Sequence, residues 1–213
     1  MIRRRFALLV AALTGMLLAM APPARAADGD AAGSVARVKG TVVAVQDALP
    51  RALKEGDAVL IGDILSTGKD SRLEIKMIDD GVFTLGERTS FVVMDYLFGQ
   101  GQDNAALRLM SGAFKAVSGR IAQADAGKFR VETDFGAIGI RGTDFWGGVM
   151  DDGAFHVAML GGKAVIFANR GGTVEITEAG FGTTITGPDA APSTPRLWPD
   201  AKLSAAKASV AFE

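Results

Sequence analysis

Short runs in which hydrophobic and polar residues alternate, separated by glycine, dominate the chain from Ser34 onward. The clearest run is SRLEIKMID (71–79), whose apolar and charged residues take turns: Leu73, Ile75 and Met77 against Arg72, Glu74 and Lys76. A period of two places successive side chains on opposite faces of a strand. This run therefore predicts a β-strand with one buried face, and the Asp-Asp-Gly at 79–81 predicts a turn into the next strand.

Further strands are predicted in many short β-rich runs: VARV, TVVAVQ, SFVVMDY, ALRLM, AFKAVS, KFRVET, AFHVAML, KAVIFAN, TVEIT and GTTIT. Turn signals separate them, among them Ser-Gly at 111 and Gly-Gly at 161 and 171. Strands this short and this numerous predict an all-β fold of mostly antiparallel strands, in a rolled, sandwich or solenoid-like sheet.

The first 26 residues predict a cleavable signal peptide. A basic start (Arg3–Arg5) precedes an apolar run, and Ala24 and Ala26 occupy the small-residue positions that a signal peptidase requires. The apolar run is short for a membrane span and leads directly into Pro22-Pro23. We therefore expect a periplasmic protein, with release outside the cell as an open alternative.

Charge excludes one large class of partners. Removing residues 1–26 takes away four arginines and leaves 19 basic against 24 acidic residues, a net charge of −5. A nucleic-acid binder needs a basic face to neutralise phosphates, so no nucleic-acid partner is expected. The mature chain has no further apolar segment of spanning length, and cysteine is absent, so stability must come from apolar burial without disulfides.

The end of the chain changes character. We predict an all-β domain over 27–186, followed at 187–213 by a Pro-rich linker and a short helix within 199–212, with Pro199 at the first helical position. Such a helix most simply covers the sheet, and docking a partner is its alternative role.

Catalytic signatures are missing from the sequence. There is no nucleophile elbow, phosphate loop or zinc-binding histidine pair, and the one histidine, His156, stands in an alternating strand. The acidic pairs at 79–80 and 151–152 precede glycine, as turns do, although a glycosidase needs only two carboxylates. Asp103 and Asn104 are too few for a calcium loop. We therefore expect no enzyme activity, catalytic residue, metal or cofactor.

One stretch raises a specific question, because FGAIGIRGTDFWGGV (135–149) sets an arginine between glycines inside a strand pattern. Its glycine spacing fits neither phosphate fingerprint, and a strand, not a helix, follows. The stretch predicts a strand, a tight corner at Gly139 and Gly142, and a second strand.

The order of these motifs resembles the FecR domain family. GSVARVKGTVVAV resembles its opening strand pair, the block from LKEGDAVL to ERTSFVV its centre, and FRVETDFGAIGIRGTDF its closing signature. The resemblance covers about residues 33–186. The positions that match are Gly56, Asp57, Gly62, Thr67, Gly68, Gly81, Leu85, Gly112, Arg141, Gly142 and Thr143.

This resemblance implies a non-catalytic, all-β extracytoplasmic module. The family's namesakes relay signals from outer-membrane transporters to sigma factors, through a cytoplasmic segment and a membrane helix that precede the domain. Here a signal peptide takes that place, so the resemblance implies the domain and a capacity to bind a partner, but not the whole iron-signalling role.

Arg141 then has two interpretations. Its guanidinium could fork onto a carboxylate or backbone carbonyls and lock the corner, which we favour, or it could face an anionic ligand or partner. We predict a non-enzymatic module that binds another envelope protein through a strand edge or the C-terminal helix. The alternative is a glycan or peptidoglycan binder that stacks sugars on Trp146, Trp198 and Tyr96. A hydrolase using an acidic pair has least support.

Overall fold

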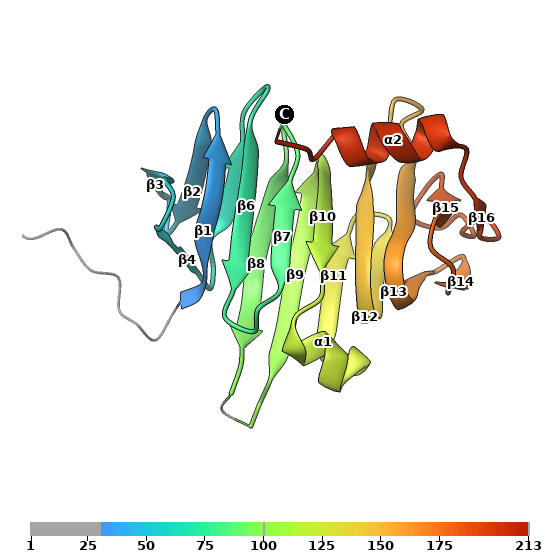
Figure 1. Ribbon diagram of the computed structural model, residues 1–213, viewed down its shortest axis with the longest axis horizontal. Helices are drawn as coiled ribbons and strands as arrows, with labels where there is room; N and C mark the ends of the chain where they lie inside the picture. The colour runs from blue at the N-terminus through green and yellow to red at the C-terminus, as the bar shows by residue number, and fades with distance from the viewer. Residues whose placement is uncertain (1–30, 100, 213) are drawn as a thin grey trace, which may run out of the picture.

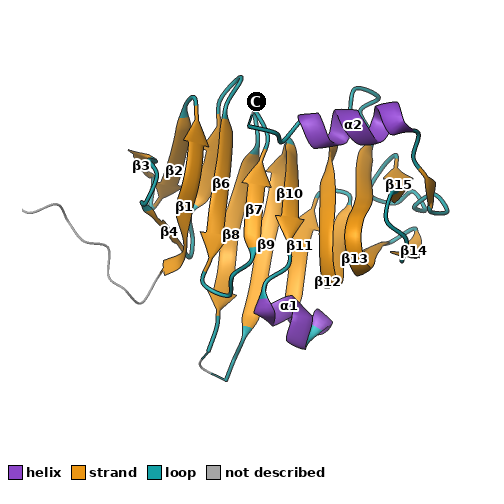
Figure 2. Cartoon of the chain, viewed as in Figure 1, coloured by secondary structure: helices purple, strands orange, loops and turns teal. Residues whose placement is uncertain are grey.

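The chain folds into a single rolled, mostly antiparallel β-sheet with short helices packed on it (Figures 1 and 2). The computed structural model describes residues 31–99 and 101–212. The predicted fold class is confirmed, including the short C-terminal helix. The expected signal peptide, residues 1–26, lies outside the described residues.

In the described part of the chain the elements form a run of strands that is interrupted once, by a short helix and a 3-10 turn, and is followed by a second helix. The strands are β1 (Ala31–Lys39), β2 (Val42–Gln46), β3 (Leu49–Ala52), β4 (Ala58–Leu60), β5 (Ile64–Thr67), β6 (Arg72–Met77), β7 (Val82–Leu85), β8 (Ser90–Leu97), β9 (Asn104–Ser111), β10 (Ala113–Val117), β11 (Phe129–Thr133), β12 (Gly136–Val149), β13 (Phe155–Asn169), β14 (Gly172–Ile176), β15 (Phe181–Ile185) and β16 (Arg196–Leu197). The helices are α1 (Arg120–Ala124), the 3-10 turn η1 (Ala126–Lys128) and α2 (Asp200–Ala208).

The sheet folds over on itself into two layers that meet at β12. One layer runs β3-β2-β5-β8-β9-β11-β12, with β9 and β11 parallel, and the other runs β12-β10-β7-β6-β1-β4. In Figure 1 the second layer lies in front of the first. β13 pairs with the edge of β12 that faces away from β10 and β11, and it also pairs with β14 and β15.

Aromatic side chains between the layers form the centre of the core. Phe83 of β7 and Phe114 of β10 face Phe91 of β8, with ring centroids 5.7 and 5.4 Å apart. Phe129 of β11 stacks on Phe83 at 6.2 Å. Burying an aromatic side chain contributes about 1.5–3 kcal/mol, so these contacts across the fold supply much of the force that holds the roll shut.

The guanidinium group of one arginine connects the two edge strands of the sheet. Arg51 of edge strand β3 donates to the carbonyl oxygen of Ala58 in β4, the opposite edge, at 3.0 Å, and it forms an ion pair with Asp63. Asp63 is fully buried and also accepts from the backbone N–H of Leu60 at 2.8 Å. A buried carboxylate is costly unless paired, so Arg51 stabilises both Asp63 and the closure of the roll.

The hairpin predicted from the alternating run is confirmed. β6 and β7 pair with Leu73 opposite Leu85 and Ile75 opposite Phe83, and the apolar side chains point into the core. Asp79 in the turn is buried: its Oδ1 accepts from the Tyr96 hydroxyl at 2.7 Å, and its Oδ2 from the N–H of Ile121 at 3.1 Å. This aspartate ties the hairpin to β8 and to the start of α1.

The Gly-Gly at 161 was predicted to be a turn between two strands, and that prediction is wrong. Both glycines lie inside β13, a strand of 15 residues that pairs with the 14-residue β12. The two strands bend together, so no reversal of the chain is needed here. The short helix α1 was not predicted either, because its five residues are too few to show a helical period.

Helix α2 lies across one face of the sheet, over β10, β12 and β13 (Figure 2). Pro199 is its N-cap, one position earlier than predicted. Ala206 and Val210 pack with Trp198 against Trp146 of β12 and Ala158 of β13, which forms a second, smaller core. The chain end then crosses the same face, since Arg72 donates to the carbonyl oxygen of Ala211 at 3.1 Å. No helix within residues 31–99 and 101–212 is long and apolar enough to span a membrane.

We predict that Arg51→Ala destabilises the protein by about 2–4 kcal/mol, because it leaves the buried Asp63 carboxylate without its counter-charge. The cost stays below that of a fully buried pair because 34% of the Arg51 side chain is exposed. Urea denaturation would measure it. Arg130→Ala is the matched control: its pair with Glu132 is 59% exposed on the arginine side and should contribute less than about 1 kcal/mol. Equal midpoints for the two variants would show that Arg51 does not close the sheet.

Candidate functional site

The candidate site lies where β12 passes from one layer of the sheet to the other. On one side β12 pairs with β13 along most of its length, from Ala137 to Val149. On the other side residues 136–138 pair with β11, whereas residues 144–148 pair with β10. On this second side, the segment between these two pairings has no strand beside it. The space there is filled by α1 and η1. Arg141, Gly142 and Thr143 therefore line a corner of the sheet.

Two glycines on the paired strands, one ladder position apart, make this corner possible. Gly142 has φ +54° and Gly162 has φ +102°, a region that favours glycine. A side chain on Gly162 would also collide with β12, because its Cβ would lie 2.3 Å from the carbonyl oxygen of Gly142. A bulge follows, where the register shifts between Asp144 and Phe145 and Leu160 has no partner in the ladder. The corner predicted near Gly142 is thus a bend within one long strand.

Thr143 fixes the corner from within and is buried. Its backbone N–H donates to the Ser118 hydroxyl at 2.9 Å, and its carbonyl oxygen accepts from the Ser118 N–H at 3.0 Å. Its own hydroxyl lies 2.7 Å from the carbonyl oxygen of Ala164. Thr143 is therefore held by the fold on both sides, which is a structural role.

Arg141 is placed differently from our favoured interpretation. Its side chain is 60% exposed, and its contact with a carboxylate among the described residues is a single 3.8 Å ion pair with Glu175, itself 47% exposed. The forked contact expected to lock the corner is not formed at Arg141, and Arg51 makes such a contact elsewhere. The bend is fixed by glycines and Thr143, so the arginine is not needed to hold it.

A cavity of about 1070 Å³ opens beside this corner. Its walls come from the end of β10, from α1 and η1, from the corner of β12 and from the bulge in β13, and they include Ser118, Gln123, Asp125, Arg141, Asp144 and Lys163. Small-molecule sites have volumes of about 300–1,000 Å³, so this cavity is large enough to hold a ligand. The family signature Arg141-Gly142-Thr143 therefore lies on the wall of a cavity, at the corner that the sequence singled out.

The charges around the cavity are not equally available. Asp125 accepts from the N–H of Gly127 at 2.8 Å, and Asp144 pairs with Lys115 at 3.2 Å. Lys163, in contrast, is exposed and has no ion pair among the described residues, and Arg141 has only its long pair with Glu175. Asp125 accepts from a backbone donor, and Asp144 is paired through Oδ2 while its buried Oδ1 has no hydrogen-bond partner. Arg141 and Lys163 have no close ion pair among the described residues.

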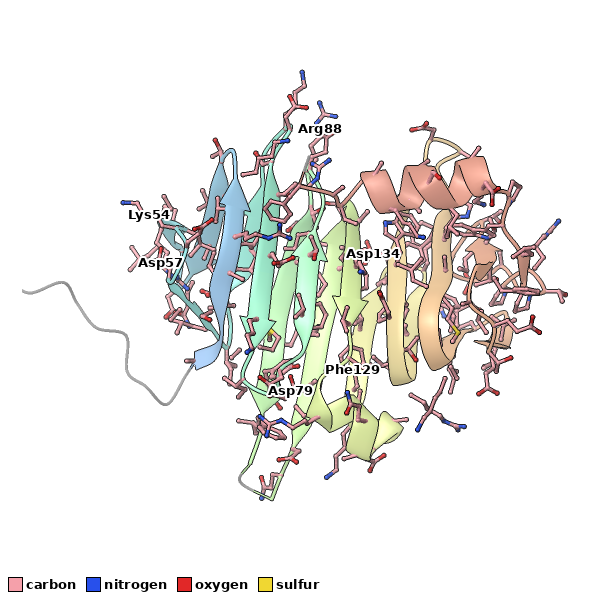
Figure 3. The ribbon with its side chains drawn as sticks, in the orientation of Figure 1. Lys54, Asp57, Asp79, Arg88, Phe129 and Asp134 are labelled. Atoms are coloured by element: carbon pink, nitrogen blue, oxygen red, sulfur yellow. The ribbon has the colours of Figure 1, made fainter. Side chains whose placement is uncertain are left out.

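The other predicted motif residues lie apart from this corner. Gly56 and Asp57 form the turn before β4, where the Asp57 carboxylate accepts from the N–H of Lys54 at 2.8 Å. Gly62 lies in the turn between β4 and β5, with φ +91°. Gly81 follows the buried Asp79 and packs near Gly119, just before α1. Figure 3 shows Asp57 and Asp79 at well-separated places on the sheet. These four positions mark turns, whereas the matching positions 141–143 border the cavity.

The sequence did not identify Lys163, Gln123 or Ser118 as members of the site. They belong to segments predicted as ordinary strand, or to α1, which was not predicted. The signal that could have found Lys163 is its position: it directly follows Gly161-Gly162, which lie beside the bulge and pair with the β12 corner.

The carboxylates weighed as catalytic pairs have no shared cleft. Asp79 is buried and hydrogen-bonded, whereas Asp80 is exposed and pairs with Lys76 and Arg120. Asp103 accepts from the N–H of Gly99 at 2.8 Å, as a hairpin tip would. Within the described part of the chain, no three His, Asp or Glu side chains are grouped to hold a metal.

The three aromatics considered for glycan stacking are all buried. Trp146, Trp198 and Tyr96 are exposed by 1%, 4% and 1%. The two tryptophans pack edge to face in the small core under α2, at 6.2 Å. They offer no platform for a sugar ring, so the structure removes the basis on which glycan binding was considered.

His156 lies in a buried polar cluster beneath α2. Its Nε2 lies 2.9 Å from the Asp152 carboxylate, and its Nδ1 lies 3.0 Å from the Thr184 hydroxyl and 3.1 Å from the Lys202 ammonium. The ammonium can only donate, so Nδ1 is the acceptor and the ring is neutral, with its proton on Nε2. The ring is completely buried and packs against Trp198 at 5.9 Å, which leaves no room for a substrate. The cluster attaches α2 to the sheet.

We predict that this cluster makes stability fall in mild acid. Burial, and to a lesser degree the Lys202 charge, lower the pKa of His156 despite the hydrogen bond to Asp152. The unfolded chain then takes up a proton first as the pH falls, so stability is constant above about pH 6.5 and declines below it. Melting temperatures between pH 8 and pH 5 would show the decline.

The chain has one histidine, so NMR titration of its imidazole reports this group without ambiguity. A His156 pKa at or above the value of a free histidine would contradict the prediction. The pKa of Asp152 is also lowered, chiefly by its hydrogen bond to His156, so its contribution is lost at still lower pH.

Comparison with known proteins agrees with this architecture. The family model described as FecR protein matches residues 63–165, which run from the turn before β5 to the second half of β13 and include the whole corner. The resemblance to the FecR domain family is therefore confirmed over residues 63–165. A search of curated proteins found no match.

Two solved structures of a protein assigned as an anti-sigma factor from Parabacteroides distasonis, at 1.65 and 2.50 Å resolution, share the fold. Each has a TM-score of 0.53 and 16% sequence identity over 67% of this chain. The match spans 63% and 62% of the two solved chains, so this chain accounts for under two thirds of their length. At this identity the likeness concerns the fold alone.

Proposed function

We propose that this protein is an exported, non-enzymatic FecR-domain module of the cell envelope that binds another envelope protein, in an assembly or signalling role. The FecR match supports a regulatory rather than a catalytic module, and the anti-sigma factor assigned to the solved structures fits the same class. The signal-peptide pattern in residues 1–26 supports export to the periplasm.

The observation that carries the proposal is the position of Arg141. An arginine in the closing signature of the domain is exposed beside a large cavity, although no structural contact requires it there. Exposed arginines are common in protein interfaces, because the guanidinium group combines five donors with a weakly hydrated planar surface. We therefore place the partner contact at the corner of β12.

The other docking surfaces considered from the sequence are less available. The apolar face of α2 is already buried, since Ala206 and Val210 pack against the sheet and Trp146 donates to the Ser209 hydroxyl at 3.0 Å. Edge strands β3 and β4 are joined by Arg51, and the edge of β15 is covered by β16 and Ser193. Removing residues 188–213 would expose the small core, so truncation is a poor test of binding.

We predict that Arg141→Ala leaves the fold intact and weakens partner capture. An exposed ion pair contributes about 0–1 kcal/mol, so the melting temperature should change by less than about 4 °C. Capture is measured by crosslinking the purified protein in envelope extract and quantifying the recovered partner. Arg170→Ala is the control, because Arg170 is 82% exposed, pairs with Asp189 at 3.0 Å and does not line the cavity.

Three outcomes would contradict this proposal in different ways. A much larger drop in melting temperature for Arg141→Ala would return that residue to a structural role. Equal capture by the wild type and by the Arg141 variant would move the contact away from the corner. Failure of the wild-type protein to recover any specific partner would remove the binding function itself.

A further inference from the structure

We propose that the cavity at the β12 corner, here called the corner groove, binds an acidic peptide segment whose carboxylates contact Arg141 and Lys163. This inference rests on the proposed function and names the chemistry of the partner's contacting segment. The corner groove consists of the cavity-lining residues of β10, α1, η1, β12 and β13 described above.

Both cations lie at the same corner because of the register of two strands. Arg141 faces Ala164 across the β12–β13 ladder and Thr143 faces Gly162, so Lys163 lies within one ladder position of Arg141. Neighbouring ladder positions normally present their side chains on opposite faces of a sheet, but the positive φ of Gly142 interrupts that alternation at the corner. Both residues line the same cavity.

Glu175 already shows how the guanidinium receives a carboxylate. It approaches Arg141 from β14, across β13, at 3.8 Å, and both side chains are about half exposed. The distance is long for a charge-assisted hydrogen bond, which is normally about 2.7–2.9 Å. Glu175 is therefore a weak internal occupant that a better-placed carboxylate from a partner would displace.

The remaining walls suit a peptide backbone. Small residues line much of the groove, among them Ala122, Ala124, Gly127, Gly161 and Gly162, so a main chain can approach closely. Gln123 and Ser118 add polar groups between them, and Val117 adds an exposed apolar surface. A site that mixes small, apolar and polar walls with two cations fits a short acidic peptide better than a free phosphate ion, which would leave most of the volume empty.

The net negative charge of the protein means that Arg141 and Lys163 can determine where an acidic peptide binds. The expected mature chain carries a net charge of −5, so an acidic segment is repelled by the protein as a whole. Arg141 and Lys163, whose one ion pair among the described residues is the long contact of Arg141 with Glu175, then attract such a segment to one place and orient it. Binding should weaken as salt is raised, because exposed charges are screened within about 8–10 Å at physiological ionic strength.

The test uses the purified exported protein and a short fluorescein-labelled peptide of alternating glutamate and alanine, followed by fluorescence anisotropy. The matching peptide with glutamine in place of glutamate is the control ligand. We expect the acidic peptide to bind and the glutamine peptide not to bind. Arg141→Gln and Lys163→Gln should each weaken binding about two- to fivefold, the range of a single exposed ion pair.

Glu175→Gln makes the test specific to the mechanism. Removing the internal carboxylate frees Arg141, so this variant should bind the acidic peptide more tightly than the wild type. Arg170→Gln should leave binding unchanged, since that arginine lies outside the groove. General attraction between an acidic peptide and surface cations would instead make Arg170→Gln weaken binding as much as Arg141→Gln.

Several outcomes would overturn the inference. Equal binding of the two peptides, or no change in the Arg141 and Lys163 variants, would show that charge recognition does not take place here. Inorganic phosphate that binds with the same dependence on these variants, without peptide binding, would reject a peptide as the occupant. Arg141-dependent partner capture without acidic-peptide binding would leave the proposed function standing and this inference wrong.

Discussion

The backbone N–H and C=O groups of strand β12 need hydrogen-bond partners on both sides of the strand, although its neighbour on one side changes from β11 to β10. The rest of the roll depends on that constraint, because this exchange is what joins the two layers into one sheet. A straight strand could not pair with both layers. The bend needs positive backbone angles and close contact between chains, which Gly142 and Gly162 provide on facing strands. The groove beside the bend is the space that the exchange leaves unpaired.

The local patterns of the sequence predicted most of the strands. Alternation identified β6 and the turn at Asp79-Asp80-Gly81 correctly, because a strand with one buried face repeats every second residue. The same reasoning divided β13 at Gly161-Gly162. A glycine pair between β-rich runs is compatible with a hairpin or with a bulge in one long strand, and only the partner strand decides between them. Pairing is long-range information that a local pattern does not contain.

For the same reason, only part of the candidate site could be predicted from the sequence. The sequence marked Gly139 and Gly142 as a corner, and the structure places the bend at Gly142, whereas Gly139 pairs with Ile166 in the regular ladder. It did not predict the opposite wall, since α1 and Lys163 reach the site through the fold and not through spacing. The role of structural fork was expected at Arg141 but is performed by Arg51. The arginine with the structural role is the one that pairs with a buried carboxylate, here Asp63. The sequence alone does not show that Asp63 is buried.

The path of the last residues links the two ends of the chain. After α2, Ala211 accepts from Arg72 in β6, and the ring of Phe212 lies 4.2 Å beneath the guanidinium of Arg37 in β1. The outer face of β1 and β6 is therefore completed by a segment that follows Arg72 by 139 residues in the chain. The ribosome makes these two strands well before it makes the residues that cover them. A chaperone that holds the unfinished chain has that one face to shield, and only until residues 211 and 212 have followed.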